Sequence, residues 1–326
     1  MTVLEWWYRL ECRIVAPAEL LGESFPTRIA GYDVTVYPPS APVGDGIAAM
    51  SSLAPPRILG RPPAKPQENW GMVSVSTSER PVGVTVEQLA FTTEVADDAD
   101  LEQIAETLVD AMDGWWETVR AWLEVVTGQH LTDVGHQEIR YIGNKTPIWP
   151  LLDDGAHGTP VSWTTTSEIR WPRRVPAVTA EILGDCVALA DVEPKLAWTL
   201  LRDARSLAEV GQHRRAVIDA ATAAELAVTA MLDDSLKSET AADAARLKKR
   251  ASTLGQKVDL LDQRGHSFPQ SFFDHLVYKR NDVVHEGQSV QPAECTAAIA
   301  ASASVVETAF PFPTPPYATR TLKRLW

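Results

Sequence analysis

Two residues near position 280 combine the chemistry that a phosphate-cleaving site needs. Arg280 and His285 lie five residues apart in a stretch whose apolar residues recur at helical intervals. A guanidinium carries a fork of donors that matches two phosphate oxygens and keeps its charge, whereas an imidazole titrates near neutrality and can give or take a proton. The pair is therefore suited to proton transfer beside a bound phosphate group.

The element that must position this pair is a helix predicted over residues 269–286. Its apolar side chains form two rows, and Arg280 occupies one of them at a point where an apolar residue is expected. A buried guanidinium needs a polar partner, so this position favours a shared, phosphate-binding seam between two chains. A separate polar row, spaced at i, i+4, i+7 and i+11, comprises Asp274, Tyr278, Asn281 and His285.

The end of this helix bears on the chemistry of His285. On an ideal α-helix, Arg280 and His285 would point about 140° apart and lie about 7.5 Å apart along the axis, which a long arginine side chain can span. Gly287 is expected to end the helix in a left-handed conformation. His285 would then lie in the last turn, where the helix dipole favours the imidazolium form.

The six residues from Arg280 to His285, Arg-Asn-Asp-Val-Val-His, resemble the Arg-x4-6-His motif of HEPN domains, which are all-helical ribonuclease modules. Ala221–Leu232 is similar to the second helix of that family, and Thr253–Leu261 is similar to the segment that precedes its motif helix. The resemblance covers about residues 190–310 and is greatest for the ApeA-like abortive-infection type.

This resemblance implies a metal-independent endoribonuclease that uses no cofactor. It implies a homodimer in which two motif helices face each other at one composite site, with Arg280, Asn281 and His285 as the catalytic residues. The RNA 2′-hydroxyl would attack the adjacent phosphate and leave a 2′,3′-cyclic phosphate. The setting it implies is toxin-like or anti-phage defence, with a trigger ligand or phage component recognised by the first half of the chain.

Other polar residues of the same region are weaker candidates. Glu225, in an Ala-Ala-Glu-Leu-Ala context, and Tyr278 are candidates for supporting polar roles. Four basic side chains either guide RNA toward the motif or form solvated helix faces, and these are Lys248, Lys249, Arg250 and Lys279.

Three alternatives to catalysis stay open at this point. His285 could cap the carbonyls of its own helix, and Arg280 could form an interhelical or dimer salt bridge. The domain could also keep the fold as a non-catalytic dimerisation or RNA-binding module.

The sequence departs at one position from the HEPN toxins that are paired with antitoxins. Those toxins have a tyrosine two residues after the histidine of the motif, and this chain has Gly287 there. Regulation through modification of that tyrosine is therefore not expected.

The chain as a whole is predicted to be an α+β protein. Residues 1–188 are expected to form a β-rich domain with one long helix at 100–126. Residues 38–68 contain eight prolines and are expected to form a long surface loop. The expected strands cover residues 4–15, 29–37, 70–77, 82–95, 134–143 and 161–171.

Residues 189–310 are predicted to form an all-α bundle of five helices. The second of these helices carries a stripe of small residues, which lets neighbouring helices approach closely. Residues 311–326 are rich in proline and then basic, and are expected to form a loosely held surface strap. The expected helices cover residues 190–210, 212–233, 240–262, 269–286 and 292–309.

Nine of the eleven tryptophans precede the predicted boundary at residue 188. They are expected to form the core of the β-rich domain, with a stacking platform for bases as the alternative. The segment Arg170–Arg174 interleaves Trp171 with three arginines, which suits either a phosphate-and-base contact or a solvated linker.

Composition limits the classes of function. The net charge of -13 excludes a protein whose whole surface attracts nucleic acid, so any RNA site must be local. Three widely spaced cysteines make neither a disulfide framework nor a metal site, which favours a reducing compartment. No apolar run long enough to cross a membrane is present, and a cytoplasmic protein without a membrane partner is expected.

Overall fold

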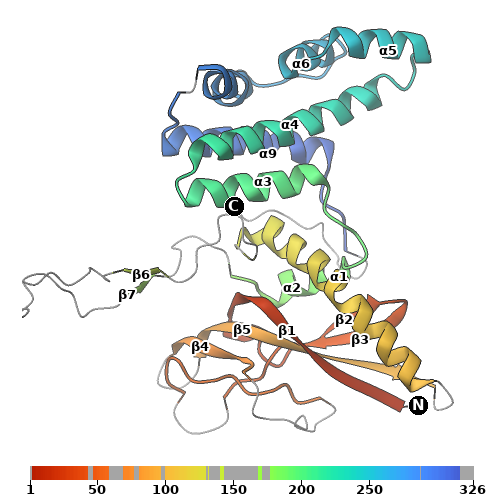
Figure 1. The fold of residues 1–326 in the computed structure, drawn as a ribbon, viewed down its shortest axis with the longest axis vertical. Helices are drawn as coiled ribbons and strands as arrows, with labels where there is room; N and C mark the ends of the chain where they lie inside the picture. The colour runs from red at the N-terminus through yellow and green to blue at the C-terminus, as the bar shows by residue number, and fades with distance from the viewer. Residues whose placement is uncertain are drawn as a thin grey trace, which may run out of the picture.

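Figure 1 shows the computed structural model of the chain, which describes residues 2–42, 47–58, 69–76, 81–96, 100–129, 131, 140–142, 168–170, 177–286 and 288–315. The fold is mixed α+β, with an antiparallel sheet in the N-terminal half and a helical C-terminal half. Apart from a short 3-10 helix at Ala18–Leu20, the described part contains eight helices when the consecutive turns from Gln270 to Glu286 are counted as one. In Figure 1, α3 is the bundle helix closest to the sheet, and α5 and α6 lie farthest from it.

The central strand of the sheet is β5, which pairs antiparallel with three others. β1 pairs with β5 along most of its length, whereas β3 pairs with the last residues of β5 and β4 with its first residues. β2 completes the sheet beyond β3. The strands are β1 (Thr2–Pro17), β2 (Phe25–Ile29), β3 (Tyr32–Tyr37), β4 (Gly71–Ser76) and β5 (Pro81–Val95).

The strand expected over residues 29–37 is confirmed as β3, which begins at Tyr32, whereas the strand β2 that precedes it was not predicted. The two strands are separated by a turn at Ala30 and Gly31, with φ values of 52° and 87°. Both values lie in the left-handed region, which reverses the chain between β2 and β3. The strands expected at 4–15, 70–77 and 82–95 are confirmed as β1, β4 and β5.

Two further predicted segments are only partly described. The short strands β6 (Arg140–Ile142) and β7 (Glu168–Arg170) pair antiparallel and fall within the extended segments expected at 134–143 and 161–171. The remainder of those segments, including Trp171–Arg174, lies outside the described residues. Within the proline-rich segment 38–68, the described residues form only isolated bridges.

The long helix α1 (Leu101–Thr127) confirms the helix expected at 100–126, and it packs on the sheet through aromatic side chains. Phe91 of β5 lies between Trp6, which stacks on it at a centroid distance of 5.5 Å, and Trp115, which meets it edge-on at 5.1 Å. The Trp115 Nε1–H donates to Thr27 Oγ1 at 3.0 Å. The aromatic residues therefore hold the helix against the sheet.

This packing confirms the core interpretation for the described tryptophans of the first half. Trp70, Trp115, Trp116 and Trp122 are buried, and Trp6 and Trp7 are partly buried and packed against the core. The remaining three, Trp149, Trp163 and Trp171, lie outside the described residues.

The prediction of a single helix in the first 188 residues is wrong. A second helix, α2 (Ala180–Ala188), begins after Thr179, whose side chain accepts a hydrogen bond from the Ile182 amide. It packs on β2, where Thr27 Oγ1 donates to the Val187 carbonyl at 2.9 Å. Its nine residues are too few for a clear helical period, which explains why the sequence pattern did not reveal it.

The helical half contains six helices between residues 196 and 309 rather than the expected five. The helix expected over 240–262 is two helices, α5 (Ala241–Arg250) and α6 (Leu254–Asp262). The break falls at Thr253, whose side chain forms a capping box with Gln256 and starts a new helix.

The core of the bundle is built on α4 (His213–Ser235), which packs against both α3 (Leu196–Glu209) and α9 (Pro292–Ala309). Its stripe of small residues is buried, as expected for closely packed helices. The Ser302 hydroxyl of α9 donates to the Ala220 carbonyl of α4 at 2.6 Å, which reflects this close approach.

The start of the C-terminal tail is part of the core, which corrects the expectation of a loosely held strap from residue 311. Phe312 is only 6% exposed and stacks on Trp198 of α3 at a centroid distance of 4.3 Å. Its ring also contacts Trp122 of α1 at 6.2 Å. The Trp198 Nε1–H donates to the Phe310 carbonyl at 2.9 Å. Residues 316–326 lie outside the described part.

We expect Phe312→Ala to lower the free energy of unfolding by about 3 to 5 kcal/mol, because it removes a buried aromatic ring between α1 and α3. Chemical denaturation followed by tryptophan fluorescence measures this loss. Ser304→Ala, at an exposed position of α9, serves as the control and should change it by less than about 0.5 kcal/mol. Equal stability of the two variants would contradict the structural role of Phe312.

Candidate functional site

The helix that carries Arg280 and His285 is continuous from Gln270 to Glu286 and is called the motif helix below. It consists of α7 (Gln270–Phe272), a π-helical segment (Phe273–Val277), α8 (Tyr278–Asn281) and a second π-helical segment (Asp282–Glu286). This confirms the helix expected over residues 269–286. Gly287, expected to end it, lies outside the described residues.

One face of the motif helix is buried in the bundle, and this burial determines which side chains face solvent. Phe272, Leu276 and Val283 are buried, and the helix packs against α4 and α9. The polar row predicted from the sequence is exposed along its whole length, with Tyr278 at 54%. The apolar row therefore anchors the helix and turns Asn281 and His285 toward solvent.

The second π-helical segment changes the relation between Arg280 and His285. A π turn closes its hydrogen bond over five residues instead of four, so a residue five positions along points more nearly in the same direction than on an α-helix. The π-helical segment Asp282–Glu286 begins two residues after Arg280 and contains His285, so it reduces the separation of about 140° that an ideal α-helix gives. Single π turns of this kind occur frequently at functional sites.

Arg280 is partly buried and is oriented by its neighbour in the motif. Its Nη1 donates to Asn281 Oδ1 at 3.3 Å. Within the described residues of one chain Arg280 forms no ion pair, so no interhelical salt bridge among them accounts for its place on an apolar row. A salt bridge between two chains stays an alternative. The His285 side chain is exposed, and it makes no hydrogen bond to a carbonyl of the described chain. Both groups are chemically accessible in a single copy of the chain.

A second arginine at this end of the bundle was not predicted. Arg214, in the first turn of α4, donates from Nη2 to the Val283 carbonyl at 3.5 Å. Val283 lies between Arg280 and His285 along the chain, so the Arg214 guanidinium lies beside the same turn of helix. The sequence signal was the run His213-Arg214-Arg215, but the approach of α4 to residue 283 depends on tertiary packing.

Lys279 has a structural partner. Its Nζ forms an ion pair with Glu294 Oε1 at 2.8 Å, which joins the motif helix to the first turn of α9. The Lys279 hydrogen bond, together with one from the Gln291 amide, lowers the pKa of Glu294. A charge already paired in this way is less available to phosphate, so an RNA-binding role for Lys279 stays a prediction.

The other predicted basic residues lie on a different part of the bundle. Lys248, Lys249 and Arg250 are exposed in the last turn of α5, and Lys248 pairs with Asp233 of α4 at 2.6 Å. The motif helix contacts α6, whereas α5 lies at the far end of the bundle in Figure 1. An RNA that reached both the motif and this basic group would have to extend along the bundle surface.

The structure does not bring Glu225 to the Arg280–His285 end of the motif helix. The Lys257 Nζ of α6 pairs with Glu225 Oε1 at 2.8 Å and donates to Thr229 Oγ1 at 3.1 Å. Eleven residues separate Glu225 from Arg214 on α4, which corresponds to about 16 Å along the helix axis. Glu225 therefore joins α4 to α6. Tyr278 lies nearer the motif, with its ring 6.4 Å from that of Phe273.

Two further observations concern metals and membranes. Within the described residues, no group of three or more His, Cys, Asp or Glu side chains is arranged to hold a metal ion. Nor does the described part of the chain contain a helix with the length and apolar character needed to cross a membrane.

Comparisons of the chain with protein-family models, with curated proteins and with solved structures give no match. The functional argument therefore depends on the residues of the motif helix and their surroundings.

We expect Lys257→Met to lower the free energy of unfolding by about 1 kcal/mol, because it leaves the partly buried Glu225 carboxylate without its hydrogen-bonded partner. Urea denaturation measures the change. Lys249→Met, an exposed lysine on the neighbouring helix α5, is the matched control and should alter stability by less than about 0.5 kcal/mol. Indistinguishable stabilities would show that the Glu225 pair does not hold α6 in place.

Proposed function

We propose that the chain is a metal-independent endoribonuclease of the HEPN type, with a bundle that acts as a homodimer. The observation that carries this proposal is the state of Arg280, which is partly buried, oriented by Asn281 and unpaired with any carboxylate of the described residues. Such a guanidinium is prepared to accept a phosphate as its partner. The exposed His285 on the following π turn supplies a group that can transfer a proton.

The reaction proposed for this pair needs only side chains and the RNA itself. A base takes the proton of the 2′-hydroxyl, the 2′ oxygen attacks the adjacent phosphorus, and the bond from phosphorus to the 5′ oxygen breaks. An acid then protonates the leaving 5′ oxygen. The products are a 2′,3′-cyclic phosphate and a 5′-hydroxyl end. With two copies of His285 at a composite site, one can serve as base and the other as acid.

Arg280 and Arg214 have distinct roles in this proposal. Arg280 donates to the non-bridging phosphate oxygens and stabilises the charge that develops on them in the transition state. Asn281 orients Arg280 through the hydrogen bond between their side chains. Arg214 is a second donor at the same end of the bundle, suited to a neighbouring phosphate of the strand.

The biological role that we propose follows from the resemblance to toxin-like and anti-phage HEPN proteins. The nuclease would act on RNA in the cytoplasm during abortive infection, and the sheet half of the chain would recognise a trigger ligand or phage component. The resemblance and the different architecture of the two halves, a sheet and a helical bundle, support this division.

We expect His285→Ala to reduce the rate of RNA cleavage by about two to four orders of magnitude, while RNA affinity changes little, because the loss falls on proton transfer. Arg280→Lys keeps the charge but loses the two-pronged donor, so it should keep much of the binding and lose most of the rate. Cleavage of a labelled RNA and a filter-binding assay on the same samples measure the two quantities.

The controls separate catalysis from folding and from other nucleases. Thermal melts of each variant exclude unfolding as the cause of any loss, and cleavage should persist in EDTA. A 2′-deoxy substitution at the cut nucleotide should abolish the reaction. Folded His285→Ala that cleaves as fast as the wild type would remove His285 from the mechanism. RNA binding without cleavage by the wild type would instead identify a non-catalytic RNA-binding module.

We also expect the chain to form a homodimer through the motif helix. Two large side chains, Tyr278 at 54% and Val284 at 44%, are exposed beside Arg280 and would be covered in a dimer. Light scattering at micromolar concentration should give the mass of two chains, and Val284→Glu should reduce it to one. Val109→Glu, at a 67% exposed position of α1, is the matched control. A monomeric wild type would contradict the composite site.

A further inference from the structure

The first strand leaves part of the sheet edge open. β1 is the outer strand of the sheet, and among the described strands it pairs with β5 alone. On the side away from β5, the backbone of Val3–Arg9 forms no hydrogen bond with any described residue. In an antiparallel ladder every second residue points its N–H and C=O away from the partner strand, so this stretch of about 20 Å offers several free backbone groups.

Other parts of the sheet edge are covered by the chain itself. Beyond β4, Val73 donates to the Ser51 carbonyl at 2.8 Å and accepts from the Met50 amide at 2.6 Å. The far end of β1 is also covered, because the Val15 carbonyl accepts from the Val178 amide at 2.9 Å. Proteins usually cover or shorten a free strand edge, since it pairs readily with another extended chain. The open stretch of β1 is therefore a place where such a chain can add.

Helix α1 runs beside this edge and presents a row of carboxylates to it. The Trp6 and Tyr8 side chains of β1 contact α1, where Tyr8 donates to Asp113 Oδ1 at 2.8 Å. Asp113 belongs to a row of exposed acidic residues on α1, called the acidic row below, which therefore borders β1. This row is about 22 Å long, close to the length of the open edge. Its members are Glu102, Glu106, Asp110, Asp113 and Glu117.

A hollow of about 540 Å³ lies along the same flank of α1. In Figure 1, α1 and β1 begin at the same end of the sheet, so the hollow accompanies the start of β1. Its lining combines two apolar side chains, one of them 67% exposed, with three carboxylates of the acidic row. The apolar residues are Ala105 and the more exposed Val109, and the carboxylates are those of Glu102, Glu106 and Asp110.

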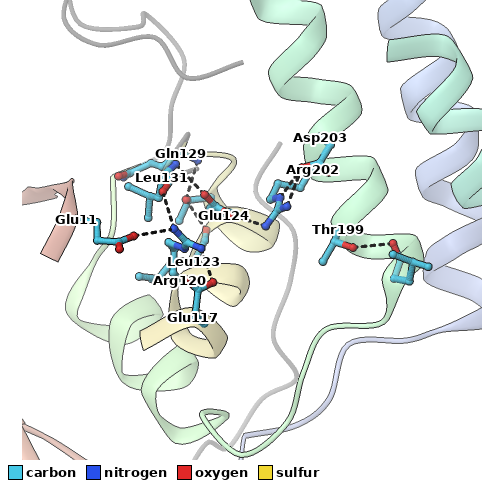
Figure 2. A network of polar contacts seen from close by, with 12 residues as sticks. Glu11, Glu117, Arg120, Leu123, Glu124, Gln129, Leu131, Thr199, Arg202 and Asp203 are labelled. Carbon is cyan, nitrogen blue, oxygen red and sulfur yellow. Dashed lines mark hydrogen bonds and ion pairs between the residues drawn. The ribbon is translucent and has the colours of Figure 1, made fainter. Parts of the chain in front are cut away.

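The far end of the acidic row is neutralised by the chain itself. Figure 2 shows Arg120 of α1 in contact with Glu117, the last member of the row, and with Glu11 of β1. Within the described residues, the three carboxylates that line the hollow have no cationic partner. They are therefore free to pair with cations from outside the chain.

A strand added to β1 would bring its side chains to these carboxylates. It would lie about 4.8 Å from β1, and every second side chain would point to the face of the sheet that α1 covers. Lysine and arginine are long enough to reach the acidic row from those positions. The alternate side chains would point to the other face, beside Val3 and Trp7, where uncharged residues fit.

We propose that the open edge of β1 binds an extended polypeptide with a basic residue at every second position. The backbone of β1 supplies the hydrogen bonds, and the acidic row selects the basic side chains. The same carboxylates repel the phosphates of a nucleic acid. A second copy of the chain fits poorly, because antiparallel pairing of two β1 strands puts both α1 helices on one face with their acidic rows opposed. This binding is independent of whether the motif helix cleaves RNA.

The synthetic heptapeptide Lys-Val-Lys-Thr-Lys-Val-Lys tests this surface. Fluorescence anisotropy measures its affinity for the full-length chain at about 0.1 M salt, where the screening length is about 10 Å. Glu106→Lys combined with Asp110→Lys should weaken binding about tenfold, because each change replaces an attraction by a repulsion. Asp259→Lys combined with Asp262→Lys is the matched control. It changes the net charge equally at exposed positions of α6, far from the sheet in Figure 1, and should alter the affinity less than about twofold.

Methylation of the peptide backbone distinguishes strand addition from a purely electrostatic contact. Two versions of the peptide carry methyl groups on the amide nitrogens either of the lysines or of the intervening residues. In a strand these two sets of N–H groups point to opposite edges. One version should therefore bind at least about tenfold more weakly, and the other should bind nearly as well as the parent peptide. Binding should also protect alternate amides of Val3–Arg9 from hydrogen exchange.

Three results would overturn the proposal. The first is no binding at millimolar peptide, and the second is an equal loss of affinity in the two methylated versions. The third is an affinity that Glu106→Lys with Asp110→Lys leaves unchanged. Protection of Val3–Arg9 that depends on the concentration of the chain and not on the peptide would assign the edge to a second copy instead.

Discussion

The last turn of α1 is enclosed by protein on every side, because six consecutive residues from Trp122 to Thr127 are buried. A helix end in that position must find partners for its free carbonyls and polar side chains within the protein. Arg202 and Arg205 supply donors from α3, to the Glu124 carboxylate at 2.6 Å and to the Thr127 carbonyl at 3.3 Å. Gln129 lies just beyond the helix, and its side-chain amide accepts from the Val15 N–H and donates to the Val15 carbonyl on β1. The packing of the sheet and α1 against the helical bundle depends on these contacts. Phe312 packs beside them, between Trp122 and Trp198.

Periodicity predicted the long elements well, because each buries one continuous face. The helices at 100–126, 212–233 and 292–309 and the strands β1 and β5 fall where the sequence pattern placed them. The failures have local causes. The hairpin at Ala30–Gly31 interrupts an apolar alternation that continues on both sides of it. The break at Thr253 depends on a capping box, whose Thr-x-x-Gln pattern is visible in the sequence but was outweighed by helix propensity on both sides.

The motif helix and its polar row could be predicted because their spacing is local, whereas the surroundings of the motif could not. The π turns depend on which carbonyl each amide finds, and residue types alone do not specify that choice. Arg214 reaches Val283 across 69 residues of sequence, and Arg202 reaches Glu124 across 78. A single sequence contains no record of such pairings, and neither arginine belongs to a motif. Phe312 was missed for the same reason, because a proline-rich tail gives no sign of the two tryptophans that enclose it.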